Sequence, residues 1–424
     1  MGGANPASVA KATRNVTAHG VKPQAAPGTS YPVKILTLID HYLPGWKAGG
    51  PTQSIAALIS TLPSDFEFWV VTRDRDHRDR CPYDGITPKR WVELGKAKVL
   101  YLPPLFENVW VIAQAARVAR PDVIYLNGLF SRLTLWCLVA RKLRLVPNVP
   151  VILAPRGEMA TSALKLKAYK KRPFLWIARG LGLFKGICWQ ASSGAEKADI
   201  LSQFSGPTRV AVSPNVVIAA DIAESGFEGS DVLVAPPKDP GAVQFLFLAR
   251  ISRMKNLDFL LRALSHVRGN ASLDIIGPID DSRYWKECQE IIKHLPENIC
   301  VEYRGAVPHS KVAAAMSARH FLVLPTRGEN FGHVIYEALV AGCPVVLSDT
   351  TIWTGVAAAG GGWAIPLGKE GAWQAALQEC VDMGPARYGE MASASRAFGA
   401  AAAAKQESVR VNIEMFRRVV KGGN

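Results

Sequence analysis

The sequence has few of the features that mark a membrane or secreted protein. No apolar run approaches the roughly 20 residues that a membrane-spanning helix needs, and the run at residues 133–140 (LTLWCLVA) is far too short. Residues 1–30 are rich in Ala, Gly, Pro and Ser and contain no apolar core of the kind found in secretory signals. We therefore expect a disordered tail over residues 1–30 and a cytoplasmic protein.

Cysteine is sparse, and metal-ligand patterns are missing. The seven cysteines never form a C-x-x-C pair, which argues against a disulfide framework and a structural zinc site. Asp74 and Asp76 match a D-x-D metal motif, but four arginines and a histidine interleave with the acids of this stretch, which favours a salt-bridged loop. We expect no metal and no other cofactor. An NAD-dependent dehydrogenase is disfavoured because the chain lacks a G-x-G-x-x-G loop.

Acidic residues are scarce in the first half of the chain. Residues 1–215 carry 29 Lys and Arg against 13 Asp and Glu, whereas residues 216–424 carry 21 against 22. The excess is concentrated between residues 132 and 185, where Glu158 is the only acid beside twelve basic residues. Such asymmetry predicts that one domain meets an anionic surface or partner.

The sequence does contain two series of short apolar runs that alternate with helical patterns. The runs read as buried parallel strands, and they begin at residues 33, 66, 97, 122, 149 and 186 and again at residues 243, 271, 299, 319 and 344. This alternation predicts an α/β protein with two doubly wound, Rossmann-like domains that face each other across a cleft.

The domain limits follow from the same pattern. We place the N-terminal, acceptor-side domain at residues 31–217 and the C-terminal domain at residues 241–395. Residues 218–240, with their Gly and Pro clusters, are predicted to be a linker. Residues 396–424 are predicted to form a C-terminal helix that packs back on the N-terminal domain. In such folds ligands bind beyond the carboxyl ends of strands, so chemistry is expected in the loops there.

Three of these loops carry candidate binding residues. Gly49 and Gly50 precede Pro51 at a predicted helix start, where backbone N–H groups can approach a phosphate, although a tight turn explains the pair as well. Arg250 and Lys255 share one strand-to-helix loop and suit a diphosphate, the alternative being a solvated basic loop.

The third loop lies in the stretch RGENFGHVIYEAL, residues 327–339. Glu329 falls in the loop and Glu337 in the following helix, which we expect to end at Gly342. Carboxylates suit sugar recognition because each can accept hydrogen bonds from neighbouring hydroxyl groups. A carboxylate beside a diphosphate needs cations nearby, and Arg250 and Lys255 are expected on the corresponding loop of the same domain.

Together these residues resemble the family 4 glycosyltransferases, which are retaining enzymes of the GT-B fold. The resemblance rests on an E-x7-E motif at Glu329 and Glu337 and on the cation pair Arg250 and Lys255. The glycine pair before Pro51 also fits. In organisation the resemblance covers roughly residues 33–420.

The resemblance implies a donor site. Arg250 and Lys255 would hold the diphosphate of a nucleoside-diphosphate sugar, Glu329 would contact the transferred sugar, and Glu337 would bind the ribose. The remaining implied donor-binding residues are Gly49, Gly50 and the backbone N–H groups of Asn330, Phe331 and Gly332. The implied activity is metal-free, retaining transfer of a hexosyl or related sugar to a glycan or lipid-linked acceptor, in cell-surface polysaccharide assembly.

The N-terminal domain departs from the family pattern at two places. Asn127 stands where members often carry a histidine, and the next predicted strand ends in APRGE where members often have His-Asp. Asn127, Arg156 and Glu158 are therefore candidate acceptor or sugar contacts. An amide cannot act as a base, so Asn127 could only orient the sugar.

The basic segment at residues 164–185 leaves two interpretations open. Either it contacts an anionic membrane surface, which would place the enzyme on the inner face of the cell membrane, or it is an amphipathic helix with its aromatic residues in the core. The candidate membrane contacts are Lys165, Lys167, Lys170, Lys171 and Arg172. Nucleic acid is not an expected partner. The alternative to an enzyme is a non-catalytic, nucleic-acid- or membrane-binding protein on a degenerate GT-B fold.

Overall fold

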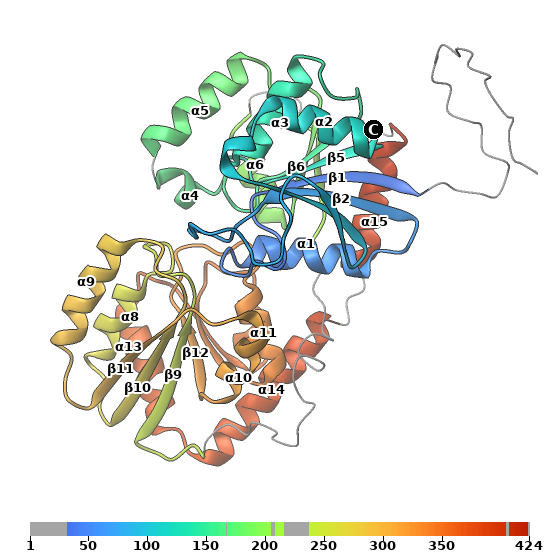
Figure 1. Ribbon diagram of the computed structural model, residues 1–424. Coiled ribbons are helices and arrows are strands. Elements are labelled where there is room, and N and C mark those ends of the chain that lie inside the picture. Colours follow the sequence, from blue (N-terminus) through green and yellow to red (C-terminus); the bar gives the residue numbers. More distant parts are fainter. Residues whose placement is uncertain (1–31, 167, 205–207, 216–236, 404–406, 423–424) are drawn as a thin grey trace, which may run out of the picture.

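The computed structural model describes residues 32–166, 168–204, 208–215, 237–403 and 407–422. The predicted tail over residues 1–30 lies outside the described residues, as does most of the predicted linker. The described chain forms two α/β domains, one above the other in Figure 1.

The N-terminal domain is built on an eight-stranded sheet in the order β3-β4-β2-β1-β5-β6-β7-β8. Strand β3 runs antiparallel to β4, and the other neighbours are parallel. The strands are β1 (Val33–Ile39), β2 (Phe66–Arg73), β3 (Trp91–Leu94), β4 (Ala97–Leu102), β5 (Val123–Asn127), β6 (Val151–Ala154), β7 (Ile187–Ala191) and β8 (Val210–Val212). The sequence did not reveal β3 and β8, because both are short and neither is a continuous buried apolar run.

Helices cover both faces of this sheet, as the apolar strands require. The helical elements are α1 (Gly50–Thr61), η1 (Pro104–Phe106), α2 (Val109–Ala119), α3 (Arg132–Lys142), α4 (Thr161–Lys165), α5 (Ala168–Gly180) and α6 (Gly194–Ser202). Alternate residues of β1 point to opposite faces: Leu36 and Leu38 pack in a core with α2, α3 and α5. Ile35 and Ile39 pack in a second core with α1.

The C-terminal domain has a six-stranded parallel sheet in the order β11-β10-β9-β12-β13-β14. Its strands are β9 (Ala242–Leu248), β10 (Asn270–Ile276), β11 (Ile299–Gly305), β12 (Phe321–Leu324), β13 (Val345–Ser348) and β14 (Gly362–Ile365). The order reverses between β9 and β12, and ligands of such sheets bind beyond the carboxyl ends of strands at that point.

Helices also surround the second sheet, and its core is one continuous apolar cluster. The helical elements are α8 (Leu257–Leu264), α9 (Ser282–Lys293), η2 (His309–Lys311), α10 (Val312–Ser317), α11 (His333–Ala341), α12 (Gly355–Ala358), α13 (Glu370–Asp382) and α14 (Pro385–Ala403). Gly342 ends α11 in the left-handed conformation, at the position where the sequence predicts the helix to stop.

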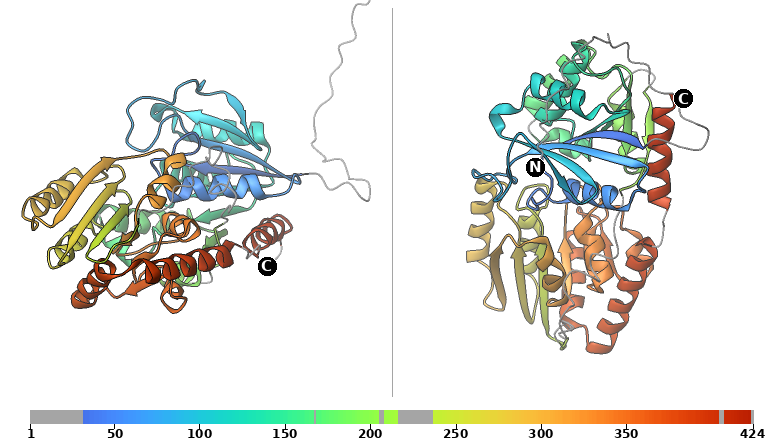
Figure 2. Two further views of the ribbon diagram at one scale, coloured as in Figure 1. Left: turned by 90° about the horizontal axis from the view of Figure 1, so that it is seen from below. Right: turned by 45° about the vertical axis from the view of Figure 1, so that its right-hand side comes forward.

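The chain returns to the N-terminal domain at its end, as Figures 1 and 2 show. Helix α15 (Glu407–Val420) lies on the first sheet, where the ring of the fully buried Phe416 contacts Phe66, Phe68 and Tyr125. The predicted boundary at residues 395 and 396 falls inside α14, which continues to Ala403 and packs on α11. The helix continues through Gly399, where a Cβ would lie 2.8 Å from the backbone nitrogen of Val340 on α11, so close packing on α11 carries the helix past the predicted boundary.

No helix within the described ranges is long and apolar enough to cross a membrane.

Candidate active site

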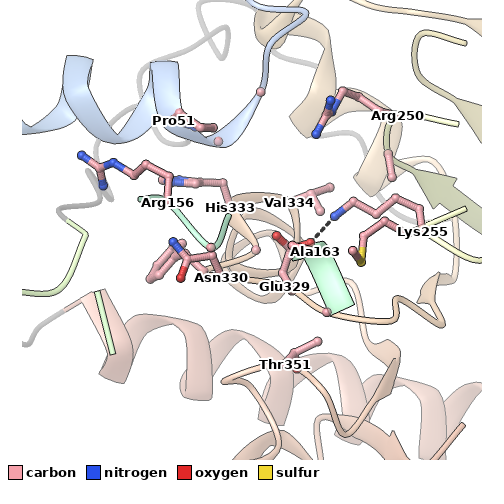
Figure 3. Close-up of a pocket in the computed structure, with 18 of the residues that line it drawn as sticks. Pro51, Arg156, Ala163, Arg250, Lys255, Glu329, Asn330, His333, Val334 and Thr351 are labelled. Carbon is pink, nitrogen blue, oxygen red and sulfur yellow. Dashed lines mark hydrogen bonds and ion pairs between the residues drawn. The ribbon is translucent and has the colours of Figure 1, made fainter. Parts of the chain in front are cut away.

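A cleft of about 780 Å³ lies between the carboxyl edges of the two sheets, and Figure 3 shows part of its lining. The predicted site residues that line it are Gly49, Gly50, Arg156, Glu158, Lys171, Arg250, Lys255, Glu329, Asn330, Phe331, Gly332 and Glu337. The fold therefore brings residues from both halves of the chain to one place. Asn127 is not among the lining residues.

Lys255 and Glu329 form an ion pair at the centre of the second-domain wall (Figure 3). Lys255 follows β9 and Glu329 follows β12, and these strands are neighbours in the sheet. Both side chains are largely withdrawn from solvent, at 14% and 17% exposure. Removal from water strengthens the attraction between the two charges. The pair presents one cation and one carboxylate to the same part of the cleft.

Arg327 and Asn256 hold these two loops together. The Arg327 guanidinium donates to Asn256 Oδ1 from Nε at 3.0 Å and from a terminal nitrogen at 2.8 Å. The Arg327 N–H donates to the carbonyl of Met254 at 2.8 Å. Asn256 stands at the N-cap position of α8, but its side chain accepts from Arg327 and makes no cap hydrogen bond.

Arg250 lies on the same wall and pairs with Asp280, which follows β10. The distance from an Arg250 terminal nitrogen to Asp280 Oδ2 is 3.3 Å. Asp280 also accepts from His77 Nε2 and Arg78 Nε of the N-terminal domain, each at 3.0 Å. The His77 hydrogen bond and these cations lower the pKa of Asp280 to about 2. Asp280 thus connects a predicted diphosphate-binding arginine to the other domain.

Contacts with Trp353 fix the loop from Glu329 to Gly332. Trp353 Nε1 donates to the carbonyl of Phe331 at 2.5 Å, and the rings of Phe331 and Trp353 lie 5.3 Å apart. Gly332 has φ of +81°, and a Cβ there would lie 2.9 Å from Ile335, so glycine is required. Within the described residues, the N–H groups of residues 330–332 donate no hydrogen bond. They remain available to a ligand.

Glu337 lies on α11 and also lines the cleft. Burial raises the pKa of its carboxyl group to about 8, so the group is mainly protonated at neutral pH. His309 Nδ1 lies 4.0 Å from Glu337 Oε1. A protonated carboxyl can donate one hydrogen bond and accept others, which suits a diol.

The glycine pair lies at the start of α1, opposite α11. Gly49 has φ of +76° and is the N-cap residue, and Pro51 follows in the first turn. A Cβ on Gly50 would lie 3.3 Å from the ring of His333. The first turn of α1 therefore approaches the second domain more closely than a larger residue at position 50 would permit.

Arg156 and Asn127 form a polar network beneath the first-domain wall. Asn127 Oδ1 accepts from Arg156 Nε at 3.1 Å and from a terminal nitrogen at 2.7 Å. The guanidinium also donates to Tyr125 Oη, at 2.7 Å, and to Asn215 Oδ1. Asn127 is only 3% exposed, and its Nδ2 has no hydrogen-bond partner among the described residues. The predicted contact of Asn127 with a ligand is thus replaced by a contact with Arg156.

Glu158 borders the same wall. Its Oε2 accepts from the N–H groups of Leu129, at 2.5 Å, and Phe130, at 3.2 Å. Burial raises the pKa of Glu158 to about 7, and the two N–H donors oppose that rise. One carboxyl oxygen is therefore fixed by the backbone at the start of α3.

The D-x-D stretch forms a loop held by ion pairs and backbone contacts. Asp74 pairs with Arg75 at 2.8 Å. Asp76 Oδ2 accepts from the N–H groups of Trp46, at 2.7 Å, and Lys47, at 2.9 Å. Across the described ranges, no group of three or more His, Cys, Asp or Glu side chains is arranged to hold a metal ion.

The basic segment at residues 164–185 divides between core and surface. Phe174 packs on Phe130 with ring centroids 5.4 Å apart, and Phe184 is buried. Trp176 is 78% exposed, and Tyr169 is exposed beside it on α5. Lys165, Lys170 and Arg172 are exposed, whereas Lys171 is half-buried and donates to the carbonyl of Ala163 at 2.7 Å. Lys167 lies outside the described residues.

Comparison with known proteins fits this geometry. The family described as "Glycosyl transferases group 1" matches residues 234–396. Over these residues the C-terminal domain is similar to glycosyltransferase group 1 domains. A phosphatidyl-myo-inositol mannosyltransferase of Mycobacterium leprae is 32% identical to this chain over 138 residues, which are 31% of this chain and 35% of that protein. The chain covers between 26% and 63% of the length of the three curated relatives it matches.

Solved structures extend the likeness beyond the group 1 domain. Sucrose-phosphate synthase from Thermosynechococcus elongatus superposes with a TM-score of 0.69 at 19% identity, covering 93% of this chain and 100% of that one. HepE of Anabaena, in complex with UDP and glucose, superposes with a TM-score of 0.64 at 15% identity, covering 92% and 100%. The predicted GT-B fold is confirmed.

Proposed function

We propose that this protein is a retaining, family 4-type glycosyltransferase that takes its sugar from a nucleoside-diphosphate sugar. The observation that carries this proposal is the juxtaposition of Lys255, Glu329 and Arg250 on one wall of the cleft. The two cations suit a diphosphate, and Glu329 can accept hydrogen bonds from sugar hydroxyls. The HepE structure holds UDP and glucose, which supports a sugar nucleotide as the ligand class.

The carboxylate partners of Lys255 and Arg250 suit the cleft to a diphosphate. Lys255 and Arg250 are paired with Glu329 and Asp280, so neither cation is left uncompensated in a partly buried place. A bound diphosphate would replace these carboxylates as the partner of each cation. Glu329 would then be free to contact the sugar, and the N–H groups of residues 330–332 would assist.

The chemistry assigned to these residues is electrostatic. The bond between the anomeric carbon and the β-phosphate oxygen breaks, and the acceptor oxygen bonds to that carbon on the same face. The acceptor proton leaves with the nucleoside diphosphate. Arg250, Lys255 and the N–H group of Gly50 stabilise the charge that develops on the leaving group, while the Gly49 N–H donates to the carbonyl of Trp46 at 3.1 Å and shapes the loop. Glu337 binds the ribose.

The direct test is transfer or hydrolysis of radiolabelled UDP-, GDP-, ADP- and dTDP-sugars by wild-type protein and by Arg250→Ala and Glu329→Ala. We expect the wild type to consume the sugars of one nucleotide class. Both variants should remain folded but lose activity by a factor of about 100 or more. The control is Arg253→Ala, on the same loop, because Arg253 is exposed, pairs with Glu287 and does not line the cleft. Full turnover by both cleft variants would contradict the proposal.

We also propose that α5 brings the enzyme to a lipid-linked or membrane-borne glycan acceptor, on the cytoplasmic face of the cell membrane, in polysaccharide assembly. The outward side of α5 combines exposed apolar side chains with cations. The apolar members are Tyr169, Trp176 and Ile177, with Leu181 directly after the helix, and the cations are Lys170, Arg172 and Arg179. Aromatic and basic residues on one helix suit an anionic lipid interface. Lys171 and Ala163 line the cleft, so the segment is adjacent to the acceptor side.

Co-sedimentation with phosphatidylcholine vesicles, with and without phosphatidylglycerol, tests this contact. We expect the wild type to bind the anionic vesicles in a salt-sensitive way. Trp176→Ser and Lys170→Glu should each weaken this binding. The control is Lys286→Glu, which makes the same charge change as Lys170→Glu at an exposed position of α9 in the other domain. It should bind the vesicles like the wild type. Equal loss in all three variants, or no vesicle binding by the wild type, would refute the membrane contact without touching the donor site.

A further inference from the structure

Polar contacts join the two domains across the cleft, and one of them includes a histidine that lines it. His333 Nε2 lies 2.7 Å from Ser54 Oγ. Ser192 Oγ lies 2.8 Å from Asn330 Oδ1, and His77 contacts Asp280 as described above. These contacts bridge the two domains across the cleft. Of these contacts, the Ser54–His333 pair involves the first residue of the helix that follows the sugar-contacting loop.

The His333 ring is held in one orientation. Its face packs against Phe331 with ring centroids 4.7 Å apart, and its Nε2 meets Ser54. In Figure 3 it lies between Pro51, at the start of α1, and Asn330. Burial, together with the charges of Arg156 and His309, lowers the pKa of His333 to about 3. At neutral pH the ring is therefore uncharged, with one donor nitrogen and one acceptor nitrogen.

Ser54 is the matching group on the first domain. It is buried on α1, within the first two turns after Gly49. Its hydroxyl group bonds to His333, the first residue of α11. The pair thus connects two helices whose N-termini both open on the cleft: α1 follows the glycine loop, and α11 follows the loop that carries Glu329.

We propose that Ser54 and His333 form a positioning pair for sugar transfer. The pair forms on domain closure, fixes the glycine loop against the loop at residues 329–332, and leaves Nδ1 of His333 to hydrogen-bond a hydroxyl group of the bound sugar. This inference rests on the proposed function and adds a sugar contact that the charged residues do not supply. Because burial, together with the charges of Arg156 and His309, opposes protonation, His333 acts as an oriented hydrogen-bonding group and carries no charge.

The test compares Ser54→Ala, His333→Phe and their double variant with the wild type. Phe keeps a ring against Phe331 but offers no nitrogen. We expect kcat to fall about fivefold for Ser54→Ala and about tenfold for His333→Phe, the size of a lost oriented hydrogen bond, with donor KM unchanged within about twofold. The double variant should be no worse than His333→Phe, since both changes remove one contact.

Two matched variants separate positioning from folding. Ser60→Ala lies on the same helix, where the exposed Ser60 bonds to the carbonyl of Ala57, and it should behave as wild type. Ser54→Thr keeps the hydroxyl group and should restore most of kcat. Small-angle scattering of the unliganded variants supplies a readout that needs no substrate: Ser54→Ala and His333→Phe should have a larger radius of gyration than Ser60→Ala.

The outcomes distinguish this inference from the proposed function. If the wild type turns over a sugar nucleotide but kcat of both variants equals that of Ser60→Ala, the positioning pair is refuted and the proposed function stands. Additive losses in the double variant would also refute it. If the wild type turns over no sugar nucleotide, the proposed function fails, and equal radii of gyration for all variants would then refute closure through this pair as well.

Discussion

Arg156 on the first-domain wall is held differently from Lys255 and Arg250 on the second-domain wall. On the second-domain wall Lys255 and Arg250 are each paired with a carboxylate, and an anionic ligand can take the place of either partner. On the first-domain wall Arg156 donates to the neutral oxygens of Asn127, Asn215 and Tyr125, and within the described residues it has no carboxylate partner. Lys255 and Arg250 are therefore suited to exchange their carboxylate partners for a diphosphate, whereas Arg156 belongs to a fixed framework of neutral hydrogen-bond acceptors.

The largest effect we predict from this comparison is the loss of turnover in Glu329→Gln. Glu329→Gln removes the negative charge but leaves Lys255 in place, so nucleoside diphosphate should bind as tightly as before or more tightly. Turnover should fall about 100-fold, because the contact with the transferred sugar is weakened. Isothermal titration with UDP, GDP, ADP and dTDP, beside a turnover assay, measures the two effects separately. A parallel loss of nucleotide affinity and turnover would show that Glu329 does not act on the sugar alone.

A smaller effect is expected on the first-domain wall, and it should be on stability. Asn127→Ala leaves the Arg156 Nε without its acceptor and leaves one terminal nitrogen with Tyr125 Oη alone, which should lower the free energy of unfolding of this domain by about 1–3 kcal/mol. Nucleotide affinity should remain within about twofold of the wild-type value. Urea denaturation measures the loss, and Asn148→Ala, at an exposed position of the same domain, is the control. A large drop in nucleotide affinity would contradict the view that the Asn127–Arg156 contact stabilises the first domain and does not bind the nucleotide.

The smallest effect concerns the pH dependence of Glu337. Its folded pKa of about 8 lies above the ordinary value of 4.5, so its contribution to stability is fully present below about pH 4.5 and is lost as the pH rises toward 8. Glu337→Gln cannot ionise and should not show this loss. The difference in melting temperature between variant and wild type should thus grow in favour of the variant from pH 5 to pH 8.5. A constant difference would mean that Glu337 is not buried in its neutral form.

The sequence predicted the second wall better than the first. Arg250, Lys255 and Glu329 follow parallel strands, and the carboxyl ends of parallel strands meet at one edge of a sheet, so their proximity follows from the strand pattern alone. Asp280, Arg327 and His333 lie on neighbouring predicted elements, but their partners depend on side-chain direction and on how the domains close. No spacing in the sequence encodes the contact of His333 with Ser54, 279 positions away.

The same limit explains the errors in the fold. Strand β14 begins at Gly362 in a run of glycines that resembles a loop, and it is a strand because Val345 and its neighbours offer a sheet edge. Asn127 ends a buried strand as predicted, but its side-chain oxygen accepts from Arg156 and the residue does not line the cleft. Where the hydrophobic pattern determines structure, prediction succeeded, and where a tertiary contact decides, it did not.

The most direct test of the central claim is a thermal-shift comparison of wild type and Lys255→Ala with a panel of UDP-, GDP-, ADP- and dTDP-sugars and NAD. Ligand that binds only the folded protein raises its melting temperature. The account predicts that one class of sugar nucleotide stabilises the wild type, that Lys255→Ala abolishes most of this shift, and that Arg253→Ala retains it. Stabilisation by NAD alone, or a sugar-nucleotide shift that Lys255→Ala leaves intact, would contradict the claim that this wall binds a nucleoside-diphosphate sugar.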